Sequence, residues 1–327
     1  MQEYELNILE QYDLEIKNTR KTRGAFLCET EQGLFLLKEA MISDKRAEVL
    51  NSLGNILIRS GYEKIDRIRS NKDGNLISVS EDGSRYILKH WYYGRECDVR
   101  RNRELFEGAA NLARLHLVMK MPVSECEMEA PLIKIYESRN RELRKVRQFV
   151  RSRSARGEFE LQFLKEFEGL FEWARAGISE LRLSEYEELY RESQREQVWI
   201  HGEYNYHNIL FTQDGIATTC FEKCKCNVQA EDLYYFLRKA MEKHRWNVRL
   251  CDCMLNAYNA VRPMDEREME YLKIRFIYPE KFWKIAGAYY RSNKAWILVK
   301  NVEKFQVAVS QTEEKKQLLK DIFGFSL

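Results

Sequence analysis

Residues 201–211 read His201-Gly202-Glu203-Tyr204-Asn205-Tyr206-His207-Asn208-Ile209-Leu210-Phe211, and this stretch decides the fold. It places an acid directly after His-Gly, then four residues, an asparagine and an apolar run. A carboxylate at that position can accept a proton, and an amide oxygen can ligate a hard metal ion. The spacing therefore predicts one site in which Glu203 and Asn208 act together.

This spacing is typical of the catalytic loop of phosphotransferases. In that loop an aspartate accepts the proton of the substrate hydroxyl, and the asparagine holds a metal ion that bridges the nucleotide phosphates. The chain keeps Asn208 but has Glu203 at the position of the base. The extra methylene displaces the carboxylate, and a displacement of about 1 Å can cost on the order of 10²-fold in rate.

A second departure follows twelve residues after Asn208, where the template has Asp-Phe-x and the chain has Cys220-Phe221-Glu222. The aspartate of the template is the main metal ligand, and a neutral thiol is a poor ligand for magnesium. Cys220 therefore replaces the usual metal anchor. Glu222 is the nearby residue that can supply a carboxylate in its place.

The order of the other segments is that of a two-lobed kinase. The stretch Gly33–Lys38 alternates like a buried strand and ends in Lys38, where an ammonium can meet nucleotide phosphates. A helix is expected from Ser43, its N-cap, and carries Glu48. We expect Lys38 and Glu48 to form an ion pair in the nucleotide site, and Asn208 to face the same cleft. A strand over 86–96 running into a hinge and a long helix over 105–116 follow.

With these segments in place, the chain resembles the CotS family of spore coat proteins, relatives of aminoglycoside and choline phosphotransferases in the protein-kinase-like superfamily. The resemblance covers nearly the whole chain. Its main carriers are Gly94-Arg95-Glu96, Leu112-Ala113-Arg114-Leu115-His116, the loop His201 to Asn208, and Glu231-Asp232-Leu233-Tyr234-Tyr235-Phe236-Leu237-Arg238-Lys239.

The resemblance implies an α+β, two-lobed protein-kinase-like fold and a role in the coat of bacterial endospores. Synthesis in the cytoplasm and other spore coat proteins as partners are implied with it. In this type of loop His201 is expected to support the backbone. Asp232 is expected to accept backbone N–H groups of the loop.

The chain predicts a lobe boundary near its hinge. Residues 1–89 are expected to form a strand-rich N-terminal lobe, and residues 90–96 the hinge. Residues 97–327 are expected to form a larger helical lobe that carries the degenerate catalytic loop. A chain of 327 residues is long enough to bury a core of that size.

Charge does not point to a particular partner, because 54 basic and 51 acidic residues leave a net charge of +3. One basic run stands out, and we expect a solvated helix face rather than a nucleic-acid site, since no nucleic-acid motif accompanies it. Its members are Arg139, Arg141, Arg144, Lys145, Arg147, Arg151, Arg153 and Arg156. No apolar run of about 18 residues occurs, so neither a signal peptide nor a membrane span is expected.

Eight cysteines occur, at positions 28, 97, 126, 220, 224, 226, 251 and 253. No Cys-x-x-Cys pair is among them, so free thiols are expected rather than a zinc site. Whether some of these cysteines are oxidised during coat assembly is left open by the sequence.

Two functions remain. We expect a degenerate pseudokinase acting in coat assembly, for which ATP and Mg²⁺ are possible cofactors that bind weakly. The alternative is an active ATP-dependent phosphotransferase on a small molecule or a coat protein, with Glu203 as base and Glu222 as metal ligand.

Overall fold

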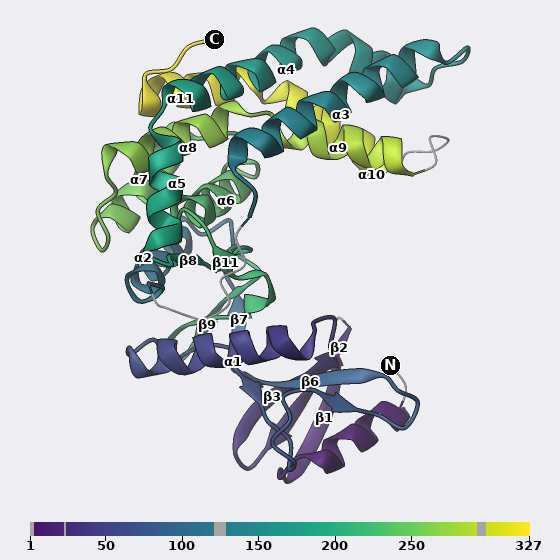
Figure 1. The fold of residues 1–327 in the computed structure, drawn as a ribbon, viewed down its shortest axis with the longest axis vertical. Coiled ribbons are helices and arrows are strands. Elements are labelled where there is room, and N and C mark those ends of the chain that lie inside the picture. The colour runs from purple at the N-terminus through teal and green to yellow at the C-terminus, as the bar shows by residue number, and fades with distance from the viewer. Residues whose placement is uncertain (1–2, 23, 121–128, 293–298) are drawn as a thin grey trace. The chain divides into compact units, whose positions relative to one another are not determined.

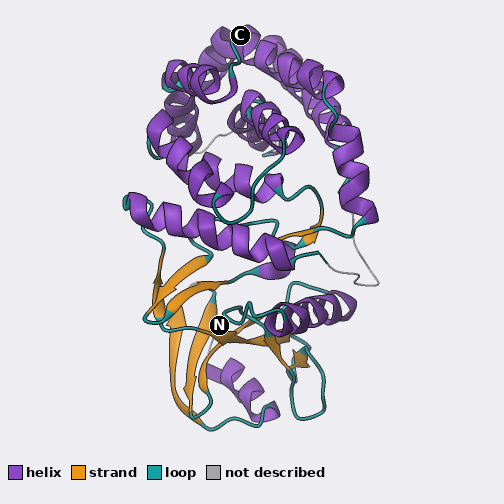
Figure 2. Ribbon diagram, turned by 90° about the vertical axis from the view of Figure 1, so that its left-hand side faces the viewer, coloured by secondary structure: helices purple, strands orange, loops and turns teal. Residues whose placement is uncertain are grey.

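The computed structural model describes residues 3–22, 24–120, 129–292 and 299–327. It is a mixed α+β structure in which strands dominate the first part of the chain and helices the rest (Figures 1 and 2). Two compact units are present. The first is formed by Met1–Glu127 with Glu196–Cys226, and the second by Met128–Arg195 with Asn227–Leu327.

An antiparallel sheet in the order β1-β2-β3-β6-β4, with β5 also paired to β6, forms the first part of the first unit. Strand pairing aligns Leu36 with Lys89, which places Lys38 and Lys89 on the same face because side chains alternate along a strand. The elements are η1 (Glu3–Gln11), β1 (Ile16–Thr22), β2 (Ala25–Thr30), β3 (Gly33–Glu39), β4 (Ile68–Arg69), β5 (Ser78–Val79) and β6 (Arg85–Trp91).

The two faces of this sheet have different chemistry. On one face, apolar side chains form a core with η1, namely Ile8, Leu9, Tyr12, Phe26, Cys28, Phe35, Leu37, Tyr86 and Leu88. The opposite face carries Lys38 and Lys89. The alternation in Gly33–Lys38 thus buries one side of β3 in the core and turns its last lysine to the other side.

Helix α1 (Asp44–Arg59) begins where the sequence predicts, because the Ser43 side chain accepts a hydrogen bond from Arg46 N at 3.2 Å. Its buried side is apolar and contains Ala47, Val49, Leu50, Leu53 and Leu57. This helix follows β3 in the chain, as the order of segments predicts.

The rest of the first unit carries the loop 201–211. Strand β7 pairs with β9, and β9 pairs with β10, so the segment after β6 is joined directly to the strand that follows Asn208. The bounds are β7 (Gly94–Glu96), α2 (Asn102–Val118), β8 (Trp199–Ile200), β9 (Ile209–Thr212), β10 (Gly215–Thr218), η2 (Phe221–Lys223) and β11 (Lys225–Cys226).

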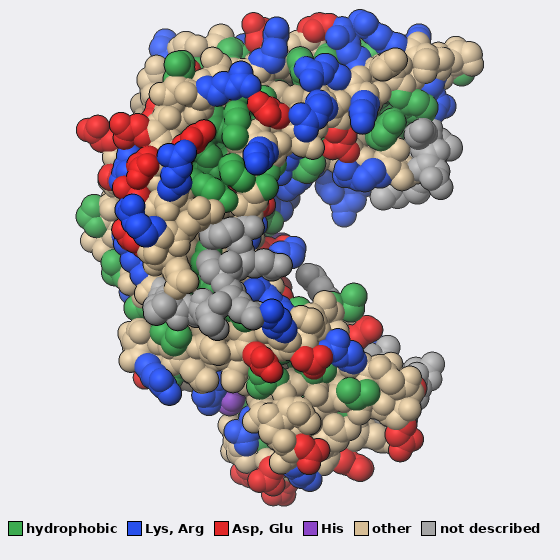
Figure 3. Space-filling model, viewed as in Figure 1, with side chains coloured by type: hydrophobic (Ala, Val, Ile, Leu, Met, Phe, Trp, Pro, Cys, Tyr) green, Lys and Arg blue, Asp and Glu red, His purple; other side chains and the backbone are tan. Residues whose placement is uncertain are grey.

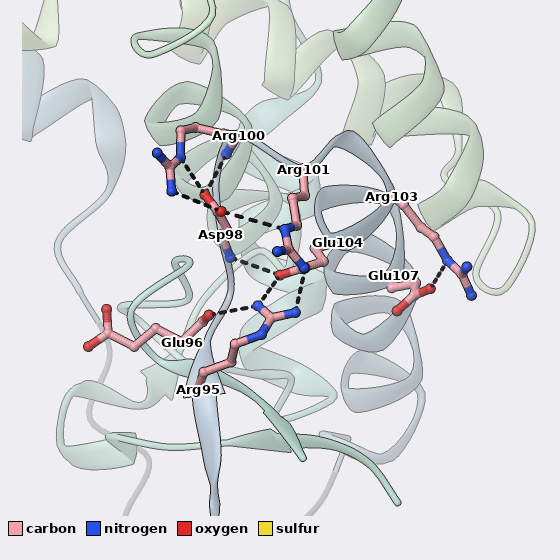
Figure 4. A network of polar contacts seen from close by, with 8 residues as sticks. All are labelled: Arg95, Glu96, Asp98, Arg100, Arg101, Arg103, Glu104 and Glu107. Carbon is pink, nitrogen blue, oxygen red and sulfur yellow. Dashed lines mark hydrogen bonds and ion pairs between the residues drawn. The ribbon is translucent and has the colours of Figure 1, made fainter. Parts of the chain in front are cut away.

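The motif Gly94-Arg95-Glu96 has a structural reason. A Cβ at Gly94 would lie 2.6 Å from Phe211 O, so only glycine lets β7 approach β9 this closely. Arg95 makes a two-pronged ion pair with Glu104 in the first turn of α2, at 2.7 and 2.6 Å (Figure 4). Glu104 also accepts a hydrogen bond from Asp98 N at 2.9 Å. The motif therefore fixes the start of α2 to the strand before it.

The second unit is helical. Aromatic side chains of α4 and α9 form much of its core, with Phe163 and Phe282 ring centroids 5.4 Å apart and Phe159 and Tyr289 4.9 Å apart. Its helices are α3 (Leu132–Ser152), α4 (Glu158–Leu183), α5 (Tyr186–Arg195), α6 (Ala230–Met241), α7 (Val248–Asn259), α8 (Glu266–Ile277), α9 (Glu280–Arg291), α10 (Val299–Ser310) and α11 (Thr312–Phe323).

The basic run falls largely on α3 and is partly neutralised. Arg139 pairs with Glu280 at 2.6 Å and stacks on the Trp283 ring at 3.9 Å, and Arg147 pairs with Glu168. Acidic and basic side chains are interspersed over the face seen in Figure 3. Within the described ranges, no helix is both long and apolar enough to cross a membrane.

The thiol prediction needs one correction. Among the described residues, six cysteines form no disulfide, namely Cys28, Cys97, Cys220, Cys224, Cys251 and Cys253. Cys226 is disulfide-bonded, so the expectation of a free thiol is wrong there. Sequence spacing missed it because a disulfide depends on which chain segments meet in space. Cys126 lies outside the described residues.

Candidate functional site

Glu222 lies between two lysines of the sheet. Its Oε1 is 2.6 Å from Lys38 Nζ and 2.9 Å from Lys89 Nζ. The Lys89 side chain is only 2% exposed, whereas that of Lys38 is 29% exposed. Because both lysines project from the same face of adjacent strands, the Glu222 carboxylate can accept a hydrogen bond from each ammonium group.

Asp66 is the fourth charged residue beside Lys38, Lys89 and Glu222. Its Oδ2 is 2.7 Å from Lys89 Nζ and accepts a hydrogen bond from Cys220 N at 2.8 Å. The Asp66 side chain is 1% exposed. We call Lys38, Asp66, Lys89 and Glu222 the charge quartet. It contains two ammonium groups and two carboxylates, so its formal charges cancel.

The pKa values of these groups follow from burial and from one another. Burial opposes ionisation of Glu222, but the ammonium groups of Lys89 and Lys38 outweigh it and hold its pKa well below the ordinary value. Burial would likewise lower the pKa of Lys89, yet the carboxylates of Asp66 and Glu222 raise it. For Asp66 burial is the largest effect and raises the pKa, although Lys89 opposes it.

Cys220 lies beside the quartet in an unusual backbone conformation. Its φ is +69° and its ψ is 52°, the left-handed region that a side chain other than glycine, asparagine or aspartate enters at a cost. Burial, followed by the charges of Asp66 and Glu222, raises the pKa of the Cys220 thiol to about 11. Without a bound metal ion, the thiol is therefore protonated near neutral pH.

The expected ion pair between Lys38 and Glu48 is wrong. Lys38 bonds to Glu222 instead, and no ion pair joins it to Glu48 within the described part of the chain. Glu48 is exposed on α1. The helix contacts the 221–224 segment through Arg46, which donates to Glu222 O at 3.1 Å and also to Cys224 O. The physical reason is proximity, since η2 brings a carboxylate directly to both lysines. Nucleotide binding by Lys38 and Glu48 stays a prediction.

The loop 201–208 is held by hydrogen bonds within its own backbone and to Thr219. His201 is fully buried; its Nε2 donates to Thr219 O at 2.9 Å, and its Nδ1 accepts from Glu203 N at 3.2 Å. Asn208 Nδ2 donates to Glu203 O at 2.9 Å, and Thr219 N donates to Asn208 O at 3.0 Å. Asn208 is thus hydrogen-bonded to Thr219, the residue directly before Cys220. Metal binding by Asn208 stays a prediction.

Gly202 and Glu203 both meet Lys223. A Cβ at Gly202 would lie 2.1 Å from Lys223 O, and its φ is +80°. The Glu203 carboxylate pairs with Lys223 Nζ at 3.0 Å and is 33% exposed. The carboxylate must therefore leave Lys223 before it can accept a proton from a substrate hydroxyl.

Asp232 lies in α6 of the second unit and is buried. Its role as a support of the catalytic loop stays a prediction.

Magnesium does not fit the donor set around Cys220 as it is arranged. Ligand atoms of Asp66, Cys220 and Glu222 lie within 4.8 Å of one another. Both carboxylates are already neutralised by lysines, however, and the thiol is protonated. A magnesium ion requires about six oxygen ligands. The donor set here has no unpaired negative charge to balance the charge of the ion. One acceptor stays open, because Asp66 Oδ1 is buried and has no hydrogen-bond partner among the described residues.

Sequence reasoning missed Asp66 and Lys89. The signal for Lys89 was present, because a lysine within Tyr86-Ile87-Leu88-Lys89 must be paired if the strand is buried. Asp66 lies between Ile65 and Arg67, and nothing in that short segment marks it.

Solved structures share this fold. An aminoglycoside phosphotransferase from Alicyclobacillus acidocaldarius aligns with a TM-score of 0.86 at 17% identity, over 97% of this chain and 94% of that one. A spectinomycin phosphotransferase, solved with ADP and spectinomycin, gives 0.65 at 13% identity, over 96% and 98%. A choline kinase from Cryptosporidium parvum gives 0.53 at 15% identity, over 98% and 97%. The predicted protein-kinase-like fold is therefore confirmed.

No curated protein matches the chain. A protein-family model matches residues 5–322, and its description is "Spore coat putative kinase YutH". This match spans nearly the whole chain and agrees with the resemblance to CotS-type spore coat proteins. The chain therefore belongs to the YutH family of kinase-like spore coat proteins.

Proposed function

We propose that the chain is a pseudokinase that acts in assembly of the endospore coat. The charge quartet is the observation that carries the proposal. Lys38, the expected phosphate ligand, is bonded to Glu222 at 2.6 Å, and Glu222 also holds the buried Lys89. Glu222, the residue that would have to supply the missing metal ligand, is thus held by two lysines of the protein.

Two further features support loss of phosphoryl transfer. Positioning and electrostatics supply nearly all of the catalysis in this reaction class. Cys220 offers a protonated thiol where the template has a charged metal ligand, and Glu203 is paired with Lys223. Synthesis in the cytoplasm and contact with other coat proteins are parts of the same proposal, supported by family membership.

A second candidate is an active phosphotransferase on a small molecule or a coat protein. The observation that favours it is the open Oδ1 of Asp66, next to the carboxylate of Glu222. For this function Lys38 must release Glu222, and Glu203 must leave Lys223 to serve as the base. Because both rearrangements break ion pairs before substrate binds, we favour the pseudokinase.

Magnesium-dependent ATP binding tests the proposal. We expect the native chain to bind ATP weakly and equally with and without magnesium, because the quartet has no excess negative charge for a cation. Cys220→Asp adds a third carboxylate, and we expect magnesium to tighten its ATP binding at least about tenfold, or about 1.4 kcal/mol. Titration calorimetry with and without magnesium measures both.

Cys220→Asn is the matched control, because asparagine also tolerates the left-handed backbone and adds no charge. It should behave like the native chain. Tight, magnesium-dependent ATP binding by the native chain would count directly against the proposal.

A further inference from the structure

A polar groove lies in the first unit beside the edge strand β4, with a cavity volume of about 650 Å³. One wall is a stripe along α1 that contains Glu48, Asn51 and Asn55. The other wall contains Arg67 and Arg69. Pockets for small molecules commonly have volumes of about 300–1,000 Å³, so the groove is large enough to hold one.

The two arginines have no carboxylate partner among the described residues. Arg69 lies in β4, Arg67 comes directly before that strand, and both line the groove. The Arg67 guanidinium makes no hydrogen bond there, and Arg69 reaches only Gln32 Oε1, at 3.4 Å. Asp44, which also lines the groove, is paired with Arg85 at 2.7 Å instead. The groove therefore contains two uncompensated guanidinium groups.

His90 adds a third nitrogen-bearing side chain. Its ring is half-buried, with its centroid 4.7 Å from that of Phe35, and makes no hydrogen bond to the described residues. Burial, followed by the charges of Arg67 and Arg69, lowers the pKa of His90 to about 4. A neutral imidazole can donate one hydrogen bond to a ligand without adding charge.

We propose that this groove binds a small polyhydroxylated molecule that carries one phosphate group. The planar guanidinium forks of Arg67 and Arg69 match the oxygens of a phosphate. The amides of Asn51 and Asn55 on the opposite wall suit the hydroxyl groups of a sugar-like body. Glu48, exposed on the same wall, disfavours a ligand with several negative charges.

This site is separate from the charge quartet. None of the four residues of the quartet lines the groove, and because strand pairing aligns Ile68 with Lys89, Arg69 projects to the face opposite Lys89. The inference therefore does not depend on whether the chain transfers phosphate.

Calorimetry with a hexose 6-phosphate and the free hexose tests the proposal on the full chain at low salt. We expect the phosphate ester to bind and the free hexose not to bind. Arg67→Gln and Arg69→Gln should each weaken binding about tenfold or more, since each removes a charge-assisted hydrogen bond to the phosphate. Arg59→Gln, at the end of α1 and outside the groove, removes the same charge and should bind like the native chain.

Thermal unfolding confirms that each variant is folded before it is titrated. Four results would overturn the proposal: no binding by the native chain, equal binding of the free hexose, unchanged binding in both groove variants, or equal weakening in Arg59→Gln. Binding that is lost in Lys38→Met and retained in the groove variants would assign the phosphate to the nucleotide site instead, and would also overturn it.

Discussion

Lys89→Met is expected to lower the free energy of unfolding by about 3–5 kcal/mol, because it removes one partner of a buried ion pair. Lys89 Nζ is 2.7 Å from Asp66 Oδ2, and the Asp66 side chain is 1% exposed. Without the ammonium, Asp66 must either stay charged in a site that excludes water or take up a proton. Urea unfolding followed by circular dichroism measures the loss.

Lys38→Met is the matched control for Lys89→Met. Lys38 contacts Glu222, as Lys89 does, but its side chain is 29% exposed, so water can replace part of what is lost. Its cost should be about 1 kcal/mol or less. The double variant Asp66→Asn with Lys89→Met should recover part of the loss, since no buried carboxylate is then left unpaired. A Lys89→Met variant as stable as the native chain would show that the quartet does not exist in solution.

Gly202→Ala is expected to destabilise the chain by about 2–5 kcal/mol, because backbone strain and a steric clash add together. The Gly202 φ of +80° is strained for alanine, and the new Cβ would lie 2.1 Å from Lys223 O. A carbonyl oxygen in a hydrogen-bonded segment cannot move aside cheaply. The same urea unfolding experiment measures the effect.

Gly54→Ala is the control for Gly202→Ala. Gly54 lies within α1, and a Cβ there meets its nearest atoms at 3.5 Å, an ordinary contact. Alanine is favoured over glycine inside a helix by about 0.5–1 kcal/mol, so this variant should be neutral or slightly stabilised. If Gly202→Ala is tolerated as well as Gly54→Ala, the described approach of residues 202 and 223 is wrong.

The sequence was sufficient to predict the fold because its signals are local. The spacing from His201 to Asn208, the cap at Ser43 and the alternation of Gly33–Lys38 each depend on a few neighbouring residues. Their order along the chain then indicated a two-lobed kinase-like protein. The structural neighbours and the family match bear this out.

The site was harder to predict because it depends on strand register and on contacts between distant segments. Lys38 and Lys89 share a face only because β3 pairs with β6 in one register, and Asp66 reaches Lys89 from a loop. The order of the Lys38 strand and the Glu48 helix along the chain predicts Glu48 as the partner of Lys38. That order does not determine which of several carboxylates lies nearest to Lys38 in the fold. Glu222 was identified as a carboxylate near the site, whereas its bonds to both lysines could not be read from the sequence.

Phosphoryl transfer tests the pseudokinase assignment most directly. Radiolabelled ATP would be incubated with the native chain and with Glu222→Ala, each against a panel of sugars, amino alcohols and coat proteins. We expect no transfer above background from the native chain, because Lys38 is held by Glu222 and Cys220 offers no charged ligand. Robust turnover by the native chain that disappears in Glu222→Ala would contradict this account and identify Glu222 as a working metal ligand.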